Sequence, residues 1–120
     1  MPYSMLVFLH RKAGTTPDQF KAYYEGTHIP LTRGLTGTAF PLTHTRRYPR
    51  PILLVGADGE LDYDAVTEVT FEDESAFQNF FAVLQRPENA AKIAADEDNF
   101  IDRARLNVFI VGDTAVTERL

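Results

Sequence analysis

Cysteine is absent from this chain of 120 residues. Its absence excludes disulfide scaffolds, thiol nucleophiles, iron–sulfur clusters and zinc sites built on cysteine. Long apolar runs are also missing, since the longest span about five residues and a membrane-spanning helix needs about 20. The N-terminus has neither a basic segment nor a long apolar stretch, so we expect no secretory signal. These absences predict a cytoplasmic protein without a membrane partner.

Positive charge is scarce in this sequence. There are 12 Lys and Arg against 17 Asp and Glu, which gives a formal net charge of −5. Because an acidic chain repels the phosphate backbone, no nucleic-acid partner is expected. Nine Phe and five Tyr supply enough apolar surface to exclude disorder, and 120 residues is the usual size of one domain. We therefore predict a single domain over residues 1–120, with residues 113–120 as a loose tail.

The first third of the chain predicts a strand followed by a helix. Residues 3–9 form a strand that is apolar on both faces. Thr16-Pro17-Asp18-Gln19 is a helix start, with threonine as N-cap, proline at the first position and glutamine three residues after the cap. Because proline interrupts a regular helix, this helix is expected to end before Pro30 and to be followed by a loop over residues 33–39.

The remaining elements complete a recognisable order. Strands are predicted over about 40–48, 63–71 and 105–112, a second helix opens at 72–75 and breaks at 86–87, and a short helical turn covers 88–95. Pro41 marks the strand over 40–48 as an edge strand. The order β-α-β-β-α-β predicts the α+β, ferredoxin-like arrangement, a four-stranded antiparallel sheet with two helices on one face. The other face would expose apolar surface, so we expect a homodimer.

Several segments resemble the EthD-domain family. They are Arg11-Lys12-Ala13-Gly14, the helix with paired tyrosines that leads into His28-Ile29-Pro30-Leu31, and the segment Asp96-Glu97-Asp98 with Phe100. The resemblance implies a dimeric α/β barrel, in which two ferredoxin-like sheets close around a cavity. Related polyketide cyclases carry a His-Pro-x-His element where this chain has Arg86-Pro87-Glu88-Asn89. The catalytic scheme of those cyclases therefore cannot operate unchanged here.

Histidine is the first candidate for general acid or base, because only imidazole titrates unaided near neutral pH. We predict that His28 or His44 is catalytic. The alternatives are a helix C-terminal cap for His28 and a structural histidine on the apolar face of its strand for His44. His10 is expected to be solvated. No histidine pair has the spacing of a metal site and the sequence has no nucleotide-binding motif, so we expect neither a metal nor a cofactor.

Five further residues are predicted to bind substrate or to position the histidine. They are Tyr23, Tyr24, Arg46, Glu68 and Asp98. One of the two tyrosines would present its hydroxyl, and Arg46 would hold a carboxylate or a phenolate. Glu68 is chosen because a strand carboxylate that faces inward is unusual. Asp98 comes from the acidic run 96–98, which would orient an imidazole or would simply form a solvated turn.

The function implied by the resemblance is a cofactor-independent enzyme of aromatic or polyketide-type metabolism. Its partners would be a second copy of the chain and a hydrophobic small molecule. Decarboxylation, dehydration, cyclisation and isomerisation all move a proton and hold an oxyanion, so these lyase and isomerase reactions stay open. Two alternatives remain: a non-catalytic, small-molecule-binding or stress-associated dimer, and a cofactor-free monooxygenase.

Overall fold

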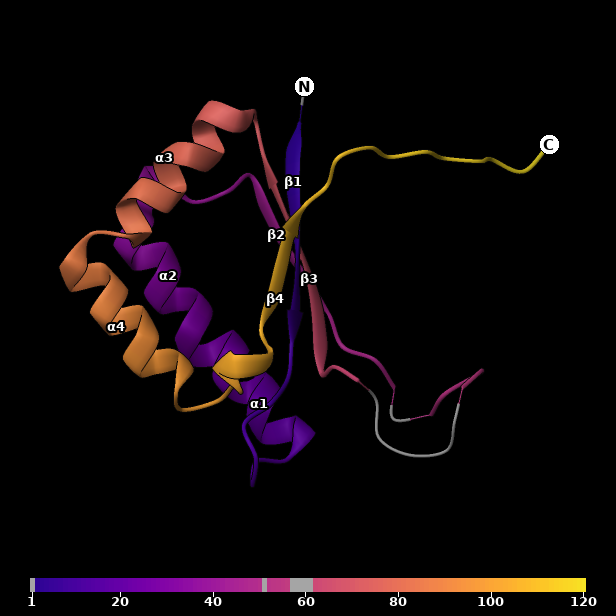
Figure 1. Ribbon diagram of the computed structural model, residues 1–120, viewed down its shortest axis with the longest axis horizontal. Coiled ribbons are helices and arrows are strands. Elements are labelled where there is room, and N and C mark those ends of the chain that lie inside the picture. Colours follow the sequence, from indigo (N-terminus) through magenta and orange to yellow (C-terminus); the bar gives the residue numbers. More distant parts are fainter. Residues whose placement is uncertain (1, 51, 57–61) are drawn as a thin grey trace.

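Four strands form one antiparallel sheet in the order β2-β3-β1-β4 in the computed structural model, which describes residues 2–50, 52–56 and 62–120. The strands are β1 (Tyr3–Leu9), β2 (Thr43–Arg47), β3 (Ala65–Phe71) and β4 (Asn107–Ile110). The helices α1 to α4 all lie on one side of this sheet (Figure 1). The predicted α+β, ferredoxin-like fold is confirmed, with β2 as an edge strand.

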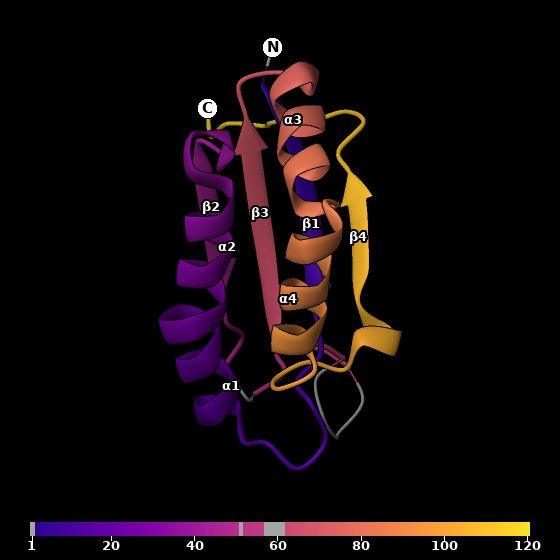
Figure 2. The same ribbon diagram turned by 90° about the vertical axis from the view of Figure 1, so that its left-hand side faces the viewer.

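The helical layer consists of two segments of consecutive helices. In the first, α1 (Pro17–Tyr23) continues through the π-helical turn η1 (Tyr24–His28) into α2 (Ile29–Thr36) and the 3₁₀ turn η2 (Gly37–Ala39). The second segment consists of α3 (Glu74–Leu84) and α4 (Pro87–Glu97), and the 3₁₀ turn η3 (Arg103–Arg105) precedes β4. Figure 2 shows α2 in front of β2, and α3 with α4 in front of β1.

The helix starts follow the sequence signals. The hydroxyl of Thr16 accepts the amide of Gln19 at 3.1 Å, and the side chain of Gln19 accepts the amide of Thr16 at 2.9 Å. This reciprocal pair is the predicted capping box. Asp73 caps α3 by accepting the amide of Ala76, and Pro87 begins α4. The break at residues 86–87 is therefore confirmed.

The predicted end of the first helix is wrong. The chain remains helical through Pro30 as far as Thr36, where a loop was expected. A regular α-helix excludes an internal proline because its ring clashes with the carbonyl four residues earlier. Here the turn before the proline is widened: the amide of Ile29 bonds the carbonyl of Tyr24, five residues back. The π turn of η1 thus accommodates Pro30 without ending the helix.

Two apolar clusters fill the space between sheet and helices. One cluster joins Met5, Val69, Phe71 and Phe80 beneath α3. The other, beneath α1 and η1, contains Leu9, Phe20, Tyr24, Ala65, Phe100 and Ile101. His10 is also buried, so the expectation that it is solvated is wrong.

The sheet face opposite the helices is open. Register places Leu6, Glu68, Thr45 and Phe109 on this face, because they are directly paired across β1, β2, β3 and β4. Figure 1 shows that the C-terminal segment and the described residues 52–56 also leave the sheet on this side. Residues 111–120 form no helix or strand. Of the excursion predicted between residues 49 and 62, residues 51 and 57–61 lie outside the described part.

Candidate active site

The first polar network of the site joins η1 to α4. Nδ1 of His28 lies 2.8 Å from Oδ2 of Asp96. The hydroxyl of Tyr23 donates to the other carboxylate oxygen of Asp96, Oδ1, at 2.6 Å. The side-chain amide of Asn99 donates to the Tyr23 hydroxyl at 3.0 Å. The bond to the Asp96 carboxylate is the main reason why the pKa of Tyr23 is raised. Asp96 is buried, so the pair lies away from bulk water.

Two adjacent tyrosines reach different parts of this site. Tyr24 is buried and its hydroxyl lies 2.8 Å from that of Thr67 on β3, whereas Tyr23 is directed to Asp96 on α4. Burial raises the pKa of Tyr24 to about 12. The sequence left open which tyrosine packs and which presents its hydroxyl. Tyr24 packs against the sheet, and Tyr23 binds the carboxylate that holds His28.

The second network joins η1 to β2. Glu25 binds Arg46 through two parallel contacts, Nε to Oε2 at 2.6 Å and Nη2 to Oε1 at 3.0 Å. Nη1 of Arg46 reaches Nδ1 of His44 at 2.9 Å, and the hydroxyl of Tyr48 donates to Glu25. The guanidinium holds the pKa of Glu25 below its usual range. Burial raises the pKa of Tyr48, and the neighbouring Glu25 carboxylate raises it further.

His44 is held in its neutral form. Burial lowers its pKa to about 4, and its interactions with Arg46 and His28 lower it further. A neutral imidazole carries a proton on one nitrogen and a lone pair on the other. At neutral pH, His44 can therefore donate or accept a hydrogen bond, but it brings no positive charge to the site.

Aromatic rings connect the two networks. Phe100 is almost fully buried, and its ring centroid lies 4.9 Å from that of His28 and 5.1 Å from that of Tyr23. The ring of Tyr24 lies 5.8 Å from His28 and 6.3 Å from His44. His28 and His44 thus pack against the same tyrosine ring.

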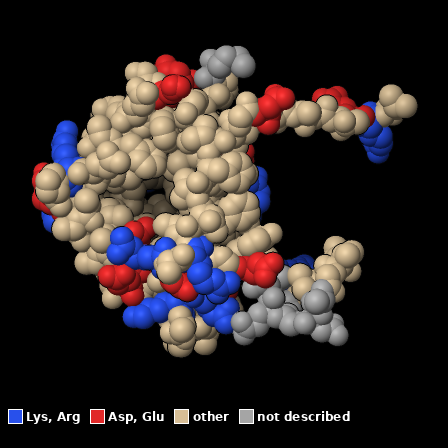
Figure 3. Space-filling model, viewed as in Figure 1, with Lys and Arg blue, Asp and Glu red and all other residues tan. Residues whose placement is uncertain are grey.

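The molecule is hollowed between its two layers. Figure 3 shows an opening between the helical layer and the sheet. Val108 and Ile110 of β4 share the helix-facing side with Val7 and Met5, yet they remain 47% and 38% exposed. The helices therefore leave part of the inner sheet face uncovered. A substrate with apolar surface could enter there and bury these side chains.

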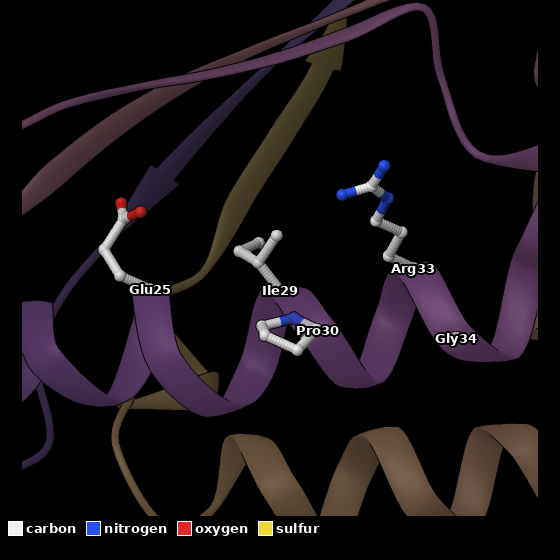
Figure 4. A pocket seen from close by; sticks show the side chains of 5 residues that line it. All are labelled: Glu25, Ile29, Pro30, Arg33 and Gly34. Atoms are coloured by element: carbon white, nitrogen blue, oxygen red, sulfur yellow. The ribbon is translucent and has the colours of Figure 1, made fainter.

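A cavity of about 460 Å³ lies along η1 and α2. Its lining consists of Glu25, Ile29, Pro30, Arg33 and Gly34. Figure 4 shows the side chains of Glu25, Ile29 and Arg33 extending from the same flank of the helix. Because Glu25 also binds Arg46, this cavity adjoins the second network. Another cavity, of about 530 Å³, lies at the turn after β1 around the Arg11–Asp64 ion pair, and none of the predicted site residues lines it.

Five of the seven residues selected from the sequence lie together in this site: Tyr23, Tyr24, His28, His44 and Arg46. Glu68 does not, because it lies on the open face of the sheet, 3.5 Å from Arg47. Asp98 is exposed beside Arg103, and Asp96 occupies the position against His28. The expectations that Glu68 faces inward and that Asp98 holds the imidazole are therefore wrong.

Sequence reasoning missed Glu25 and Tyr48. Both come from segments that it had assigned to packing or left undiscussed, and no motif marks them. The signal that could have found Glu25 is its place one residue after the paired tyrosines, on the element that also carries His28. Among the described residues, no three His, Cys, Asp or Glu side chains are gathered closely enough to hold a metal ion. No helix within that part of the chain is long and apolar enough to cross a membrane.

The fold and the two networks define a ferredoxin-like domain with a histidine–carboxylate pair between sheet and helices. The chain belongs to the EthD domain family, whose profile matches residues 12–104. It is 28% identical over 108 residues to the conidial pigment biosynthesis dehydratase EthD of Metarhizium robertsii, and the match covers 83% of this chain and 74% of that protein.

Solved structures share the fold. An EthD-like protein from Ralstonia eutropha is 19% identical with a TM-score of 0.63, over 98% of this chain and 95% of that one. A dimeric ferredoxin-like protein of unknown function from Thermobifida fusca is 15% identical with a TM-score of 0.55, over 92% and 90% of the two chains. A cofactor-independent oxygenase from Streptomyces nogalater is 12% identical with a TM-score of 0.54, over 98% and 96%. At these identities the likeness concerns the fold alone.

Proposed function

We propose that this protein is a cofactor-independent enzyme that removes a proton from an aromatic or polyketide-type substrate, with His28 as general base. The hydrogen bond between His28 and Asp96 carries the proposal. A carboxylate only accepts, so Nδ1 of His28 carries a proton, and in the neutral imidazole the free lone pair is then on Nε2. A base oriented in this way by a buried carboxylate is a recurrent arrangement in catalytic sites.

The surroundings of His28 suit a base that must be reached by a substrate. Among the described residues, no buried side-chain nitrogen or oxygen lacks a hydrogen-bond partner. In this part of the chain the protein engages His28 through Nδ1, so Nε2 keeps accessible surface. Asp96 and Tyr23 act as positioning residues, because they contact the base through its other nitrogen or through each other.

The family supports a lyase-type reaction. A relative is named as a dehydratase of pigment biosynthesis, and dehydration begins with removal of a proton next to a carbonyl when the leaving hydroxyl is in the β position. The C–H bond breaks, its proton goes to Nε2 of His28, and the electron pair moves toward the carbonyl oxygen. The proton is then available to the departing hydroxyl, which leaves as water.

We also propose that the site operates in a homodimer formed by the open sheet face. Phe109 on this face is 48% exposed and its ring lies 5.9 Å from that of Phe8. Leu6 is directly paired with Phe109 and shares its side of the sheet. Apolar groups together on one sheet face favour burial against a second sheet. The Thermobifida fusca neighbour is described as dimeric, which supports the same assembly here.

Proton removal can be tested before the natural substrate is known. The protein is incubated in D₂O with 1-tetralone, 2-tetralone and 3-hydroxy-1-tetralone, and deuterium at the carbon next to the carbonyl is followed by NMR. We expect the wild type to accelerate exchange, and His28→Gln and Asp96→Asn to slow it about 10²-fold or more. Exchange by His28→Gln at the wild-type rate would overturn the assignment. Tight binding of the ketones without any exchange would favour the non-catalytic, ligand-binding alternative.

A further inference from the structure

We propose that His44 is the hydrogen-bond donor of this site: its Nε2–H binds the substrate oxygen on which negative charge develops while Nε2 of His28 takes the proton. This assigns the two histidines opposite proton placements and makes an enolisable ketone, or the phenol formed from it, the ligand class. The inference rests on the proposed function. It adds a second catalytic group and a set of residues that fix that group's proton.

The direction of the Arg46–His44 hydrogen bond determines the tautomer. A guanidinium donates through all of its N–H groups and has no acceptor. Since Nη1 of Arg46 lies 2.9 Å from Nδ1 of His44, Nδ1 must be the acceptor. In a neutral ring the proton then resides on Nε2. At His28 the direction is reversed: the Asp96 carboxylate accepts the hydrogen bond from Nδ1. The neutral His28 ring therefore has no proton on Nε2.

Arg46 cannot easily turn away from His44. Its Nε and Nη2 are held by Glu25 in a two-point contact, which is more restrictive than a single hydrogen bond. Nη1 also donates to the backbone carbonyl of His44 at 2.8 Å. Tyr48 donates to the same Glu25 carboxylate. Glu25, Arg46 and Tyr48 are therefore positioning residues that keep a donor directed at Nδ1 of His44.

This arrangement corrects the expected role of Arg46. The sequence predicts that Arg46 holds a substrate carboxylate or phenolate, but its guanidinium is already bound to Glu25 and His44. The charge of Arg46 instead acts on the imidazole, which burial and nearby cations keep neutral at physiological pH. A neutral imidazole with a fixed Nε2–H stabilises an oxyanion without itself losing or gaining a proton.

The location of His44 fits a second group acting on the same ligand. Within the described residues, the side chain of His44 is engaged through Nδ1, and no buried side-chain nitrogen or oxygen there lacks a partner. Nε2 is therefore not fully buried. The rings of His44 and His28 both contact Tyr24. His44 also packs against Phe40, with ring centroids 6.0 Å apart, so the donor lies beside apolar surface suited to an aromatic ring.

The electron balance of the step requires no co-reactant. The base takes a proton from the carbon next to the carbonyl, the C–H electron pair forms the carbon–carbon double bond of the enolate, and charge moves to oxygen. The Nε2–H of His44 hydrogen-bonds that oxygen. In the reverse reaction His28 returns the proton to the carbon next to the carbonyl. In a dehydration it gives the proton to the departing hydroxyl, which leaves as water.

The tautomers can be read directly by long-range ¹H–¹⁵N NMR of the uniformly labelled wild type at neutral pH. The chain has three histidines, and their signals are assigned with His10→Gln, His28→Gln and His44→Gln. We expect His44 to be protonated on Nε2 alone and His28 on Nδ1. A proton on Nδ1 of His44, or on both of its nitrogens, would overturn the inference.

Ligand binding is tested separately with 4-nitrophenol, whose visible absorption reports the ionised phenolate. In mildly acidic buffer we expect the wild type to bind it with an enhanced phenolate band. His44→Phe should weaken binding of the phenolate about tenfold to a hundredfold, the range of a hydrogen bond to a charged group. Gln78→Val is the control, since Gln78 is an exposed residue of α3 that belongs to neither network and lies away from the open sheet face. Equal binding by His44→Phe and wild type would refute the donor role.

The two proposals fail in different ways. If the tautomers and phenolate binding are as expected but no ketone exchanges deuterium, the donor site stands and His28 is not a working base. If exchange depends on His28 while His44 is protonated on Nδ1, the proposed function stands and the inference about His44 is wrong. Arg46→Met adds a further check, because His44 should then lose its single tautomer while deuterium exchange keeps its dependence on His28.

Discussion

Nδ1 of His28 lies 2.8 Å from a carboxylate oxygen of Asp96, although 68 residues separate them in the chain. The contact joins the end of the π turn to the last full turn of α4. Two elements must therefore be docked before the imidazole is oriented. The packing of η1 against α4 therefore determines the orientation of the His28 imidazole.

Asp96→Asn should remove the carboxylate that fixes the His28 tautomer while keeping the shape of the side chain. We expect the rate of deuterium exchange to fall about 10²- to 10⁴-fold, with little change in the unfolding temperature. Asp98→Asn is a matched control, because Asp98 is exposed beside Arg103. Equal losses in the two variants would show that charge in this segment, and not the contact with His28, is what matters.

Phe100→Ala should be among the most destabilising single changes. Its ring is almost fully buried between Phe20, Tyr24 and His28. Deleting a buried phenyl ring costs about 3–5 kcal/mol, because apolar contact is lost and a cavity remains. Urea unfolding measures the change. Leu54→Ala serves as control at a side chain that is 99% exposed, and there the free energy of unfolding should stay within about 0.5 kcal/mol of wild type.

Stability should fall as pH decreases through the range set by His44. Its pKa is lowered to about 4 in the folded protein from 6.5. Between these two pH values His44 binds a proton in the unfolded chain but not in the folded chain. The contribution of His44 to the free energy of unfolding is therefore complete above pH 6.5 and is lost as the pH falls toward 4. The effect is at most about 3 kcal/mol in the free energy of unfolding.

His44→Gln tests this source of pH dependence. Unfolding curves at several pH values should be flatter for the variant between pH 6.5 and 4. The groups that act on His44 are Arg46, His28 and Glu25. Glu25, whose lowered pKa also favours the folded state at higher pH, contributes to both proteins. Parallel profiles for variant and wild type would mean that His44 does not titrate between these limits.

Phe109→Glu should disrupt the proposed dimer. A charge placed on the open sheet face would have to be buried without a partner when a second sheet packs there. We expect the wild type to sediment as a dimer at micromolar concentration and the variant as a monomer. Ala82→Glu, on the exposed surface of α3, is the control and should remain dimeric. A monomeric wild type would contradict the assembly itself.

The limits of sequence-based prediction are clearest at Pro30 and in the acidic run 96–98. Pro30 was interpreted as the end of the helix, and that prediction is wrong, because a local signal does not distinguish a helix that ends from one that widens into a π turn. The run Asp96-Glu97-Asp98 left a solvated turn and a carboxylate that orients an imidazole both open, and Asp98 was the residue selected from it, whereas Asp96 meets His28. Which of the three meets His28 depends on the rotation of α4 about its axis, and that is set by its packing against α2 and α3.

The sequence by itself determined the order of elements, the ferredoxin-like fold and a first strand that is apolar on both faces, because periodicity, caps and breaks are local properties of the chain. It also placed both histidines and both tyrosines among the candidates. Only the tertiary structure decided which nitrogen of each histidine is engaged. Asp96 approaches His28 from α4, whereas Arg46, held by Glu25 of η1, approaches His44. A hydrogen bond between distant elements has no local signature, so the proton placement of each imidazole follows from the folded packing alone.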